Sequence, residues 1–161
     1  MRVRATERVR AALEALGLDA ELQHFPEGTQ TAQAAADAVG CELGQIVKTL
    51  YFSADGRPTL ALVAGDRQVD TSRLAEILGI GRKKLKMGTP EEVLAHTGFP
   101  VGGVSPVGSL GTCDVVVDES LRRFSRVWAA AGEGDQVFAA ETKALVEAIG
   151  GQWATITRDG K

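Results

Sequence analysis

Two short segments of this sequence contain residue types that could do chemistry, and the first surrounds a lysine. Lys48 lies in an apolar run, 46–52, that predicts a β-strand. On that strand the lysine shares one face with three large apolar side chains, those of Ile46, Leu50 and Phe52. An unpaired ammonium is costly to bury, so Lys48 either lies at a strand edge with its head group in water or lines a cavity that receives an anion such as a phosphate. The residues alone leave both interpretations open.

The second segment, 102–106, reads Gly-Gly-Val-Ser-Pro. Glycines allow a ligand to approach the backbone closely, and successive free N–H groups can form a concave anion site that holds the oxyanion of an acyl transfer. Ser105 adds a hydroxyl to this segment. The alternative is a glycine-rich connector with no ligand. The segment lacks the Gly-Lys-Ser/Thr of a phosphate loop and the Gly-x-Ser-x-Gly of a nucleophile elbow.

Other reactive side chains are scarce, because the chain has only two histidines and two cysteines. His24 ends a predicted strand and His96 lies near the end of a predicted helix, so neither is expected to act as a base for a serine nucleophile. Cys41 and Cys113 have no CxxC partner and no nearby basic residue, and we predict that they are packing residues. This composition argues against an ordinary zinc site or a disulfide framework, and we expect no metal and no cofactor.

The formal net charge of -3 argues against a protein that binds nucleic acid by bulk electrostatics, although it permits a local basic patch. The densest basic run is Arg82-Lys83-Lys84-Leu85-Lys86, which could contact a phosphate backbone or could be a solvated face. No segment approaches the roughly 18 apolar residues of a membrane span, and no apolar signal core follows the first residues. We therefore expect a soluble cytoplasmic protein.

Periodicity and cap residues predict a mixture of helices and strands that must position these segments. Strands and helices do not alternate strictly, which favours a mixed or antiparallel sheet with packed helices in one domain, 1–161. Thr89-Pro90-Glu91-Glu92 is the clearest helix start. The expected helices cover about 6–17, 31–40 (with Thr29 as the alternative start, after a break at 26–28), 71–78, 89–98 and 142–149. The expected strands cover about 20–25, 46–52, 59–64, 114–117, 127–131, 136–140 and 153–157.

Five segments occur together in an order that resembles a known family. They are Thr-Ala-Gln-Ala-Ala (31–35), Ile-Val-Lys-Thr-Leu (46–50), Ala-Gly-Asp-Arg-Gln-Val-Asp (64–70), Val-Gly-Gly-Val-Ser-Pro-Val-Gly (101–108) and Val-Asp-Glu-Ser-Leu (117–121). From about residue 25 to residue 156 the chain resembles the YbaK/EbsC family, also called the YbaK/prolyl-tRNA synthetase associated domain. The resemblance implies an α/β fold: a single domain with a mixed, largely antiparallel, curved and barrel-like sheet and flanking helices.

The resemblance also implies an activity, the trans-editing of aminoacyl-tRNA. Family members hydrolyse the ester between a wrong amino acid and the 3′ end of a tRNA, and the implied substrate is Cys- or Ala-tRNA(Pro) or a related tRNA carrying a small amino acid. The implied partners are the 3′ end of the aminoacyl-tRNA and prolyl-tRNA synthetase. Two alternatives remain: a non-catalytic module that binds a nucleotide or a tRNA 3′ end, and a protein that docks on a synthetase.

The same resemblance implies roles for individual residues. Lys48 matches a lysine that holds the terminal nucleotide and substrate, Gly103 lies in a loop whose backbone N–H groups grip the aminoacyl carbonyl, and Ser105 lies in the same motif. An aminoacyl ester is already activated, so this chemistry needs a polarised carbonyl more than a protein nucleophile. We therefore expect Gly103→Ala to lower activity more than stability. The implied substrate-binding residues are Thr31, where cysteine-specific members carry an aromatic residue, Gly102, Val104 and Asp135.

Overall fold

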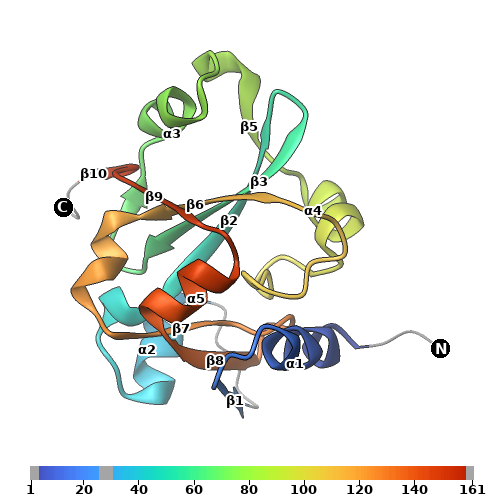
Figure 1. The fold of residues 1–161 in the computed structure, drawn as a ribbon, viewed down its shortest axis with the longest axis vertical. Coiled ribbons are helices and arrows are strands. Elements are labelled where there is room, and N and C mark those ends of the chain that lie inside the picture. The colour runs from blue at the N-terminus through green and yellow to red at the C-terminus, as the bar shows by residue number, and fades with distance from the viewer. Residues whose placement is uncertain (1–3, 26–30, 159–161) are drawn as a thin grey trace.

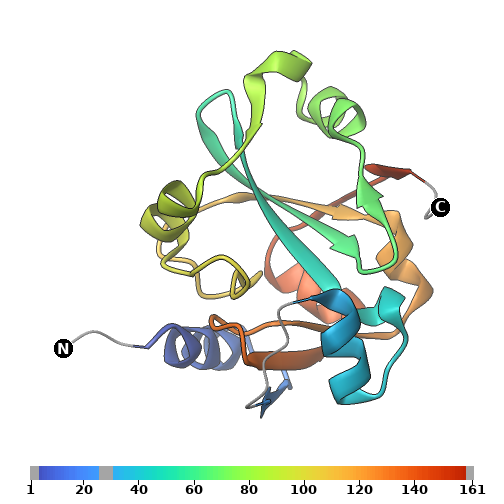
Figure 2. The same ribbon diagram turned by 180° about the vertical axis from the view of Figure 1, so that it is seen from behind.

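A five-stranded mixed sheet forms the middle of the computed structural model, which describes residues 4–25 and 31–158 (Figures 1 and 2). Strand β2 pairs antiparallel with both β3 and β5, whereas β6 pairs in parallel with β3 and with β9. In the order across the sheet, the strands are β5 (Leu85–Met87), β2 (Val47–Ala54), β3 (Arg57–Ala64), β6 (Asp114–Asp118) and β9 (Gln152–Ala154).

Two smaller antiparallel sheets accompany it. One has the order β1 (Glu21–His24), β8 (Gln136–Glu141) and β7 (Arg126–Ala130), and the other pairs β4 (Gln68–Val69) with β10 (Thr157–Arg158). The expected last strand, 153–157, is therefore split between two sheets.

The expectation of one barrel-like sheet is wrong, whereas the expected mixed, largely antiparallel pairing is confirmed, since only the pairs β3–β6 and β6–β9 are parallel among the paired strands of the described residues. The sheet is not closed, and a single parallel bridge, from Ile46 to Trp128, joins β7 to the segment that leads into β2. The connections from β3 to β6 and from β6 to β9 run through helices and return the chain in the same direction, which produces parallel pairs. The α/β class itself is confirmed.

The helices begin and end largely where the cap residues predict. The Thr31 side chain accepts a hydrogen bond from Ala34 N, and Thr89 forms a reciprocal capping box with Glu92. The helices are α1 (Ala5–Ala15), α2 (Ala32–Val39), α3 (Thr71–Leu78), α4 (Pro90–Thr97) and α5 (Thr142–Ala148), with short 3₁₀ helices η1 (Leu43–Gln45), η2 (Arg82–Lys84) and η3 (Glu119–Arg123). Within the described chain, no helix is long and apolar enough to cross a membrane. The expected break at 26–28 and the alternative start at residue 29 lie outside the described residues.

Both faces of β2 are covered, which explains its continuous apolar run. Val47 and Tyr51 belong to a core cluster that includes Phe99 and Phe138, whereas Phe52, on the other face, packs in a second cluster with Leu74 of α3. Lys48 lies on the face of Phe52, as its spacing predicts. A lysine is thereby placed in a strand that is otherwise buried on two sides.

Candidate functional site

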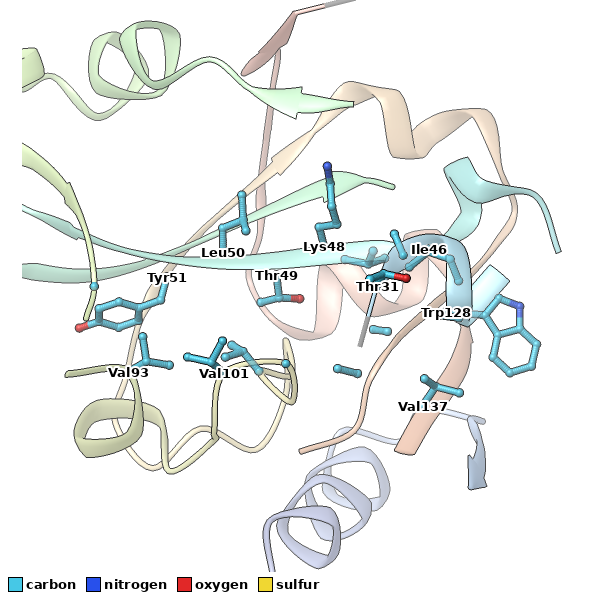
Figure 3. Close-up of a pocket in the computed structure, with 18 of the residues that line it drawn as sticks. Thr31, Ile46, Lys48, Thr49, Leu50, Tyr51, Val93, Val101, Trp128 and Val137 are labelled. Carbon is cyan, nitrogen blue, oxygen red and sulfur yellow. The ribbon is translucent and has the colours of Figure 1, made fainter. Parts of the chain in front are cut away.

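A cavity of about 440 Å³ opens along one edge of β2 (Figure 3). Strand β5 covers this edge only opposite residues 52–54, so residues 47–51 are left on the cavity side. The N-terminus of α2, the strands β7 and β8, the start of α4 and the loop 101–104 form the other walls.

Lys48 is half-buried on the wall of this cavity, and its ammonium donates a hydrogen bond to the carbonyl oxygen of Arg67. Burial lowers the pKa of Lys48, and the negative charge of Asp66 opposes that shift. Figure 3 shows Lys48 and Leu50 projecting from one side of β2 and Thr49 and Tyr51 from the other. The structure thus agrees with the cavity interpretation of Lys48, and the cavity reaches around both sides of the strand edge.

Thr49 is a polar group of this cavity that the sequence reasoning missed. The carbonyl of Tyr51 accepts a hydrogen bond from Gly88 N at 3.2 Å, so Tyr51 directs its backbone groups away from β3. Alternate residues of an antiparallel ladder face the same way, so the N–H and C=O of Thr49 also face the cavity. Its Oγ1 is buried without a hydrogen-bond partner in the described part of the chain. The only sequence signal was its position next to Lys48.

The glycine loop forms the wall below Thr49 and Tyr51. Gly102 and Val104 line the cavity, and Gly102 has a φ of 91°, a left-handed conformation that favours glycine. The Gly103 N–H donates to the carbonyl of Pro100 at 2.9 Å, so this N–H closes a turn. Within residues 4–25 and 31–158, the N–H groups of Gly102 and Val104 bond to no other residue. The donors available to a ligand are therefore those that flank Gly103.

Gly103 packs against another part of the backbone. A Cβ at this position would lie 2.8 Å from the carbonyl carbon and oxygen of Gly132 and 2.9 Å from Cα of Glu133. A methyl group here would meet the 132–133 backbone, so we expect the substitution to cost stability as well. That it lowers activity more than stability stays a prediction.

Ser105 and Asp135 lie away from the cavity wall. Ser105 is fully buried, and its Oγ accepts a hydrogen bond from Val107 N at 3.2 Å. Asp135 bonds through Oδ2 to Nε2 of His24 at 2.8 Å. Of the predicted residues, the structure brings Lys48, Thr31, Gly102 and Val104 to one cavity, and it places Gly103, Ser105 and Asp135 outside its lining.

One end of the cavity is closed by Tyr51. Its ring occupies the space that a side chain at Gly88 would fill, and its hydroxyl is hydrogen-bonded to Nδ1 of His96. Burial is the main cause that raises the pKa of Tyr51. His96 is thus engaged with a phenol rather than with Ser105.

The other potentially reactive groups lie in packed positions. Burial raises the pKa of the Cys41 and Cys113 thiols, and both side chains pack against core clusters, in agreement with the predicted packing role. Across the described residues, no three His, Cys, Asp or Glu side chains are grouped so that they could hold a metal ion.

Comparison with known proteins identifies a family. The sequence model of the family described as "Aminoacyl-tRNA editing domain" matches residues 26–148. The "Uncharacterized protein YwhH" of Bacillus subtilis is 31% identical over 86% of this chain and 88% of its own length. An Enterococcus faecalis protein named "Putative Cys-tRNA(Pro)/Cys-tRNA(Cys) deacylase EbsC" is 29% identical over 83% of this chain and 80% of its own length. These matches confirm the resemblance to the YbaK/EbsC family.

The chain is also similar to part of a larger enzyme and to a solved structure. A proline--tRNA ligase of Nitratidesulfovibrio vulgaris is 41% identical over 59% of this chain, but the match spans only 16% of the ligase. A crystal structure described as "a putative trans-editing enzyme for prolyl tRNA synthetase" is 37% identical, with a TM-score of 0.90 and coverage of 98% of this chain and 99% of that one. The fold is therefore shared along nearly the whole chain.

Proposed function

Because this chain belongs to the aminoacyl-tRNA editing domain family, we propose that it is a deacylase that hydrolyses the ester between a wrongly attached amino acid and the 3′ end of a tRNA. One observation carries this proposal: a half-buried lysine and a loop with unpaired backbone N–H groups line the same cavity. The first suits an anionic or electron-rich part of the tRNA end, and the second suits an ester carbonyl.

The chemistry that these groups support is direct attack by water. In this mechanism, the N–H groups of Gly102 and Val104 donate to the carbonyl oxygen and stabilise the negative charge that develops there as water adds to the carbon. The bond from that carbon to the ribose oxygen then breaks, and the ribose oxygen takes up the proton that the attacking water gives up. Lys48 holds the terminal nucleotide from the other side of the β2 edge, so that the ester lies against the loop. Thr49, which lies between these two groups, positions the substrate.

We further propose that the amino acid is small, alanine or cysteine. The cavity walls from α2 and β7 include Ala32, Ala35, Ala129 and Ala130, while Tyr51 and Trp128 limit its extent. Excluding large side chains by size is easier than distinguishing one methylene, which is worth about 1–3 kcal/mol. The preference between alanine and cysteine is therefore a property to measure.

The sequence matches suggest how the chain acts. It corresponds to a small part of a proline--tRNA ligase, and we propose that it works in trans, as one domain spanning 1–161, on tRNA(Pro) in the cytoplasm. Prolyl-tRNA synthetase is the proposed partner. The proposed reaction uses water and the groups of the cavity, without a metal or cofactor.

The test is a panel of purified mischarged tRNAs, including Ala-tRNA(Pro) and Cys-tRNA(Pro), with correctly charged Pro-tRNA(Pro) as the control. Accelerated release of alanine or cysteine over the rate in buffer, with proline retained, is the expected result. No acceleration for any tRNA would contradict a deacylase. Tight binding of an aminoacyl-adenosine analogue without turnover would favour a non-catalytic binding module instead.

A further inference from the structure

We propose that Arg123 is a positioning residue: by holding both carboxylate oxygens of Asp66, it prevents this carboxylate from pairing with Lys48 and so keeps the ammonium available to the substrate. The inference rests on the proposed function, in which Lys48 binds the tRNA end. It assigns a role to Arg123, a residue of η3 that is outside the lining of the cavity.

Sheet topology explains why Lys48, Asp66 and Arg123 lie close together. Strands β3 and β6 are parallel neighbours, so the turn that follows β3 and the helix η3 that follows β6 lie at the same edge of the sheet. Strand β2 is antiparallel to β3, and Val47 is opposite Ala64, so Lys48 at the start of β2 lies at this edge too. Asp66 and Arg67 belong to the turn after β3, and Arg123 is the last residue of η3.

Arg123 and Asp66 form a bidentate ion pair. Nη1 donates to Oδ2 at 3.0 Å, and Nη2 donates to Oδ1 at 2.7 Å. Nε of Arg123 donates to the carbonyl of Ser120 at 2.7 Å, and the guanidinium lies 4.9 Å from the ring centre of Phe124. The guanidinium is thus fixed from its own helix, and each carboxylate oxygen of Asp66 already has a donor.

The electrostatic situation of Lys48 shows what this pair prevents. The ammonium is bonded to the carbonyl of Arg67, the residue next to Asp66, and the charge of Asp66 raises the pKa of Lys48. The hydrogen bond from Arg123 is the main cause that lowers the pKa of Asp66, so this carboxylate is ionised. Without Arg123, an ionised carboxylate near a half-buried ammonium would have Lys48 as a strong alternative partner. Asp66 would then compete with the substrate for the ammonium of Lys48.

Other charged residues lie near Asp66 and Arg123, at the same edge of the sheet. Nε of Arg67 lies 3.9 Å from Oδ1 of Asp66, while Asp118 and Glu42 raise the pKa of Arg123. The side chains of Arg123 and Asp66 are 36% and 34% exposed, so substitutions there do not open a cavity in the core. Arg122 provides a matched control, because it is a neighbouring exposed arginine of η3 that pairs with Glu119 instead.

The experiment compares Arg123→Ala, Asp66→Asn, the double variant and Arg122→Ala, using kcat/KM on a substrate of the wild type and thermal unfolding. We expect Arg123→Ala to lose about tenfold or more in kcat/KM, mainly through KM, because Lys48 becomes paired. We expect Asp66→Asn and Arg122→Ala to stay within about threefold of wild type, and the double variant to recover most of the loss, since coupled residues are not additive. If the Arg123–Asp66 ion pair only stabilises the fold, Asp66→Asn should lower kcat/KM as much as Arg123→Ala does, and the double variant should recover none of the loss.

A second readout is independent of the deacylase proposal. The pKa of Lys48, followed by NMR titration of its side chain, should rise in Arg123→Ala and return toward the wild-type value in the double variant. An unchanged pKa of Lys48 in Arg123→Ala would overturn the inference even in an active enzyme. A wild type that hydrolyses no mischarged tRNA but shows this pattern of pKa changes would refute the proposed function and leave the role of Arg123 standing.

Discussion

Lys48 lies half-buried in a strand that is otherwise mostly apolar, and its ammonium has a hydrogen-bond partner there. Its face, shared with Leu50 and Phe52, was predictable from alternation, and a buried lysine needs either a partner or a cavity. The structure supplies both, the Arg67 carbonyl and the cavity along β2. Neither follows from local sequence, because Arg67 and the cavity walls are brought to Lys48 by pairing between distant strands.

The protonation of Lys48 leads to a prediction about pH. Burial lowers its pKa, so the ammonium is lost at a lower pH than in a free lysine. In the proposed mechanism the charged form binds the substrate, so kcat/KM should be constant below this pKa and fall as the pH rises through it. The measurement is the pH profile of deacylation, corrected for spontaneous hydrolysis. Arginine stays protonated throughout this range. An identical alkaline limb in an active Lys48→Arg variant would therefore assign the titration to another group.

Gly103 gives a second residue-scale prediction. Because a Cβ there would lie 2.8 Å from the Gly132 backbone, Gly103→Ala should lower the free energy of unfolding by about 1–3 kcal/mol, as overpacking does. The matched control is Gly81→Ala, where the structure leaves open space and φ is -65°. Urea denaturation of both variants provides the measurement. If Gly103→Ala keeps full stability but loses all activity, the result would contradict this packing role and indicate that Gly103 contacts the substrate directly.

The hydrogen-bonding states of two hydroxyl groups, those of Ser105 and Thr49, could not be predicted from the sequence. Ser105 was associated with chemistry because it follows the glycines, but its Oγ bonds to Val107 N and helps to shape the loop. Thr49 was overlooked because a threonine in a strand is ordinary, and its unpaired Oγ1 is visible only in the folded chain.

At the scale of elements, the connection between β6 and the last strands depends on Asp118. This carboxylate is 1% exposed and accepts hydrogen bonds from Ser120 N at 3.0 Å, Ile156 N at 2.8 Å and Thr157 Oγ1 at 2.9 Å. Removing it leaves buried donors unsatisfied, at about 1–3 kcal/mol for each group. It therefore stabilises the junction at which β6 ends.

We predict that Asp118→Ala lowers the free energy of unfolding by about 3 kcal/mol or more, a large share of the 5–15 kcal/mol typical of a folded domain. Chemical denaturation measures this loss. Asp37→Ala is the control, because Asp37 lies on an exposed helix surface with one bond from Gln33. Equal stability of the two variants would show that the donors around Asp118 find other partners.

Helix ends were more predictable than strand partners. Thr89 and Glu92 define the start of α4 within four residues, so a local pattern is sufficient. The parallel pairing of β3 with β6 joins residues that are about 55 positions apart, such as Thr59 and Asp114, and no local pattern encodes it. The sequence therefore predicted a mixed sheet and most of its elements, but not which distant strands pair or that the sheet is open.

For the whole molecule, a net charge of -3 means that the proposed contact with tRNA must be local. The basic run 82–86 forms η2 and the start of β5, and all four of its basic side chains are exposed. The following residues, Met87 and Gly88, line the cavity, so the run leads directly to the cavity. If the tRNA 3′ end binds in the cavity as we propose, this position suits the phosphates next to it.

We therefore predict that Lys83→Ala/Lys86→Ala weakens the binding of tRNA and reduces the slope of log K against log salt by about 2, one for each lost phosphate contact. Hydrolysis of a short aminoacyl-adenosine ester should be unchanged. The control is Arg10→Ala/Lys143→Ala, which removes the same charge from α1 and α5, away from η2 and β5 (Figure 1). Equal salt slopes for the two double variants would show that the basic run is only a solvated face.

The most direct test of the central claim is single-turnover deacylation of Ala-tRNA(Pro) and Cys-tRNA(Pro) by the wild type, Lys48→Ala and the surface control Lys143→Ala. The loss of a charge-assisted contact predicts a decrease of about 10- to 100-fold in Lys48→Ala, with unchanged folding and with Lys143→Ala equal to wild type. A folded Lys48→Ala variant that cleaves both esters at the wild-type rate would contradict the role of this cavity in the reaction.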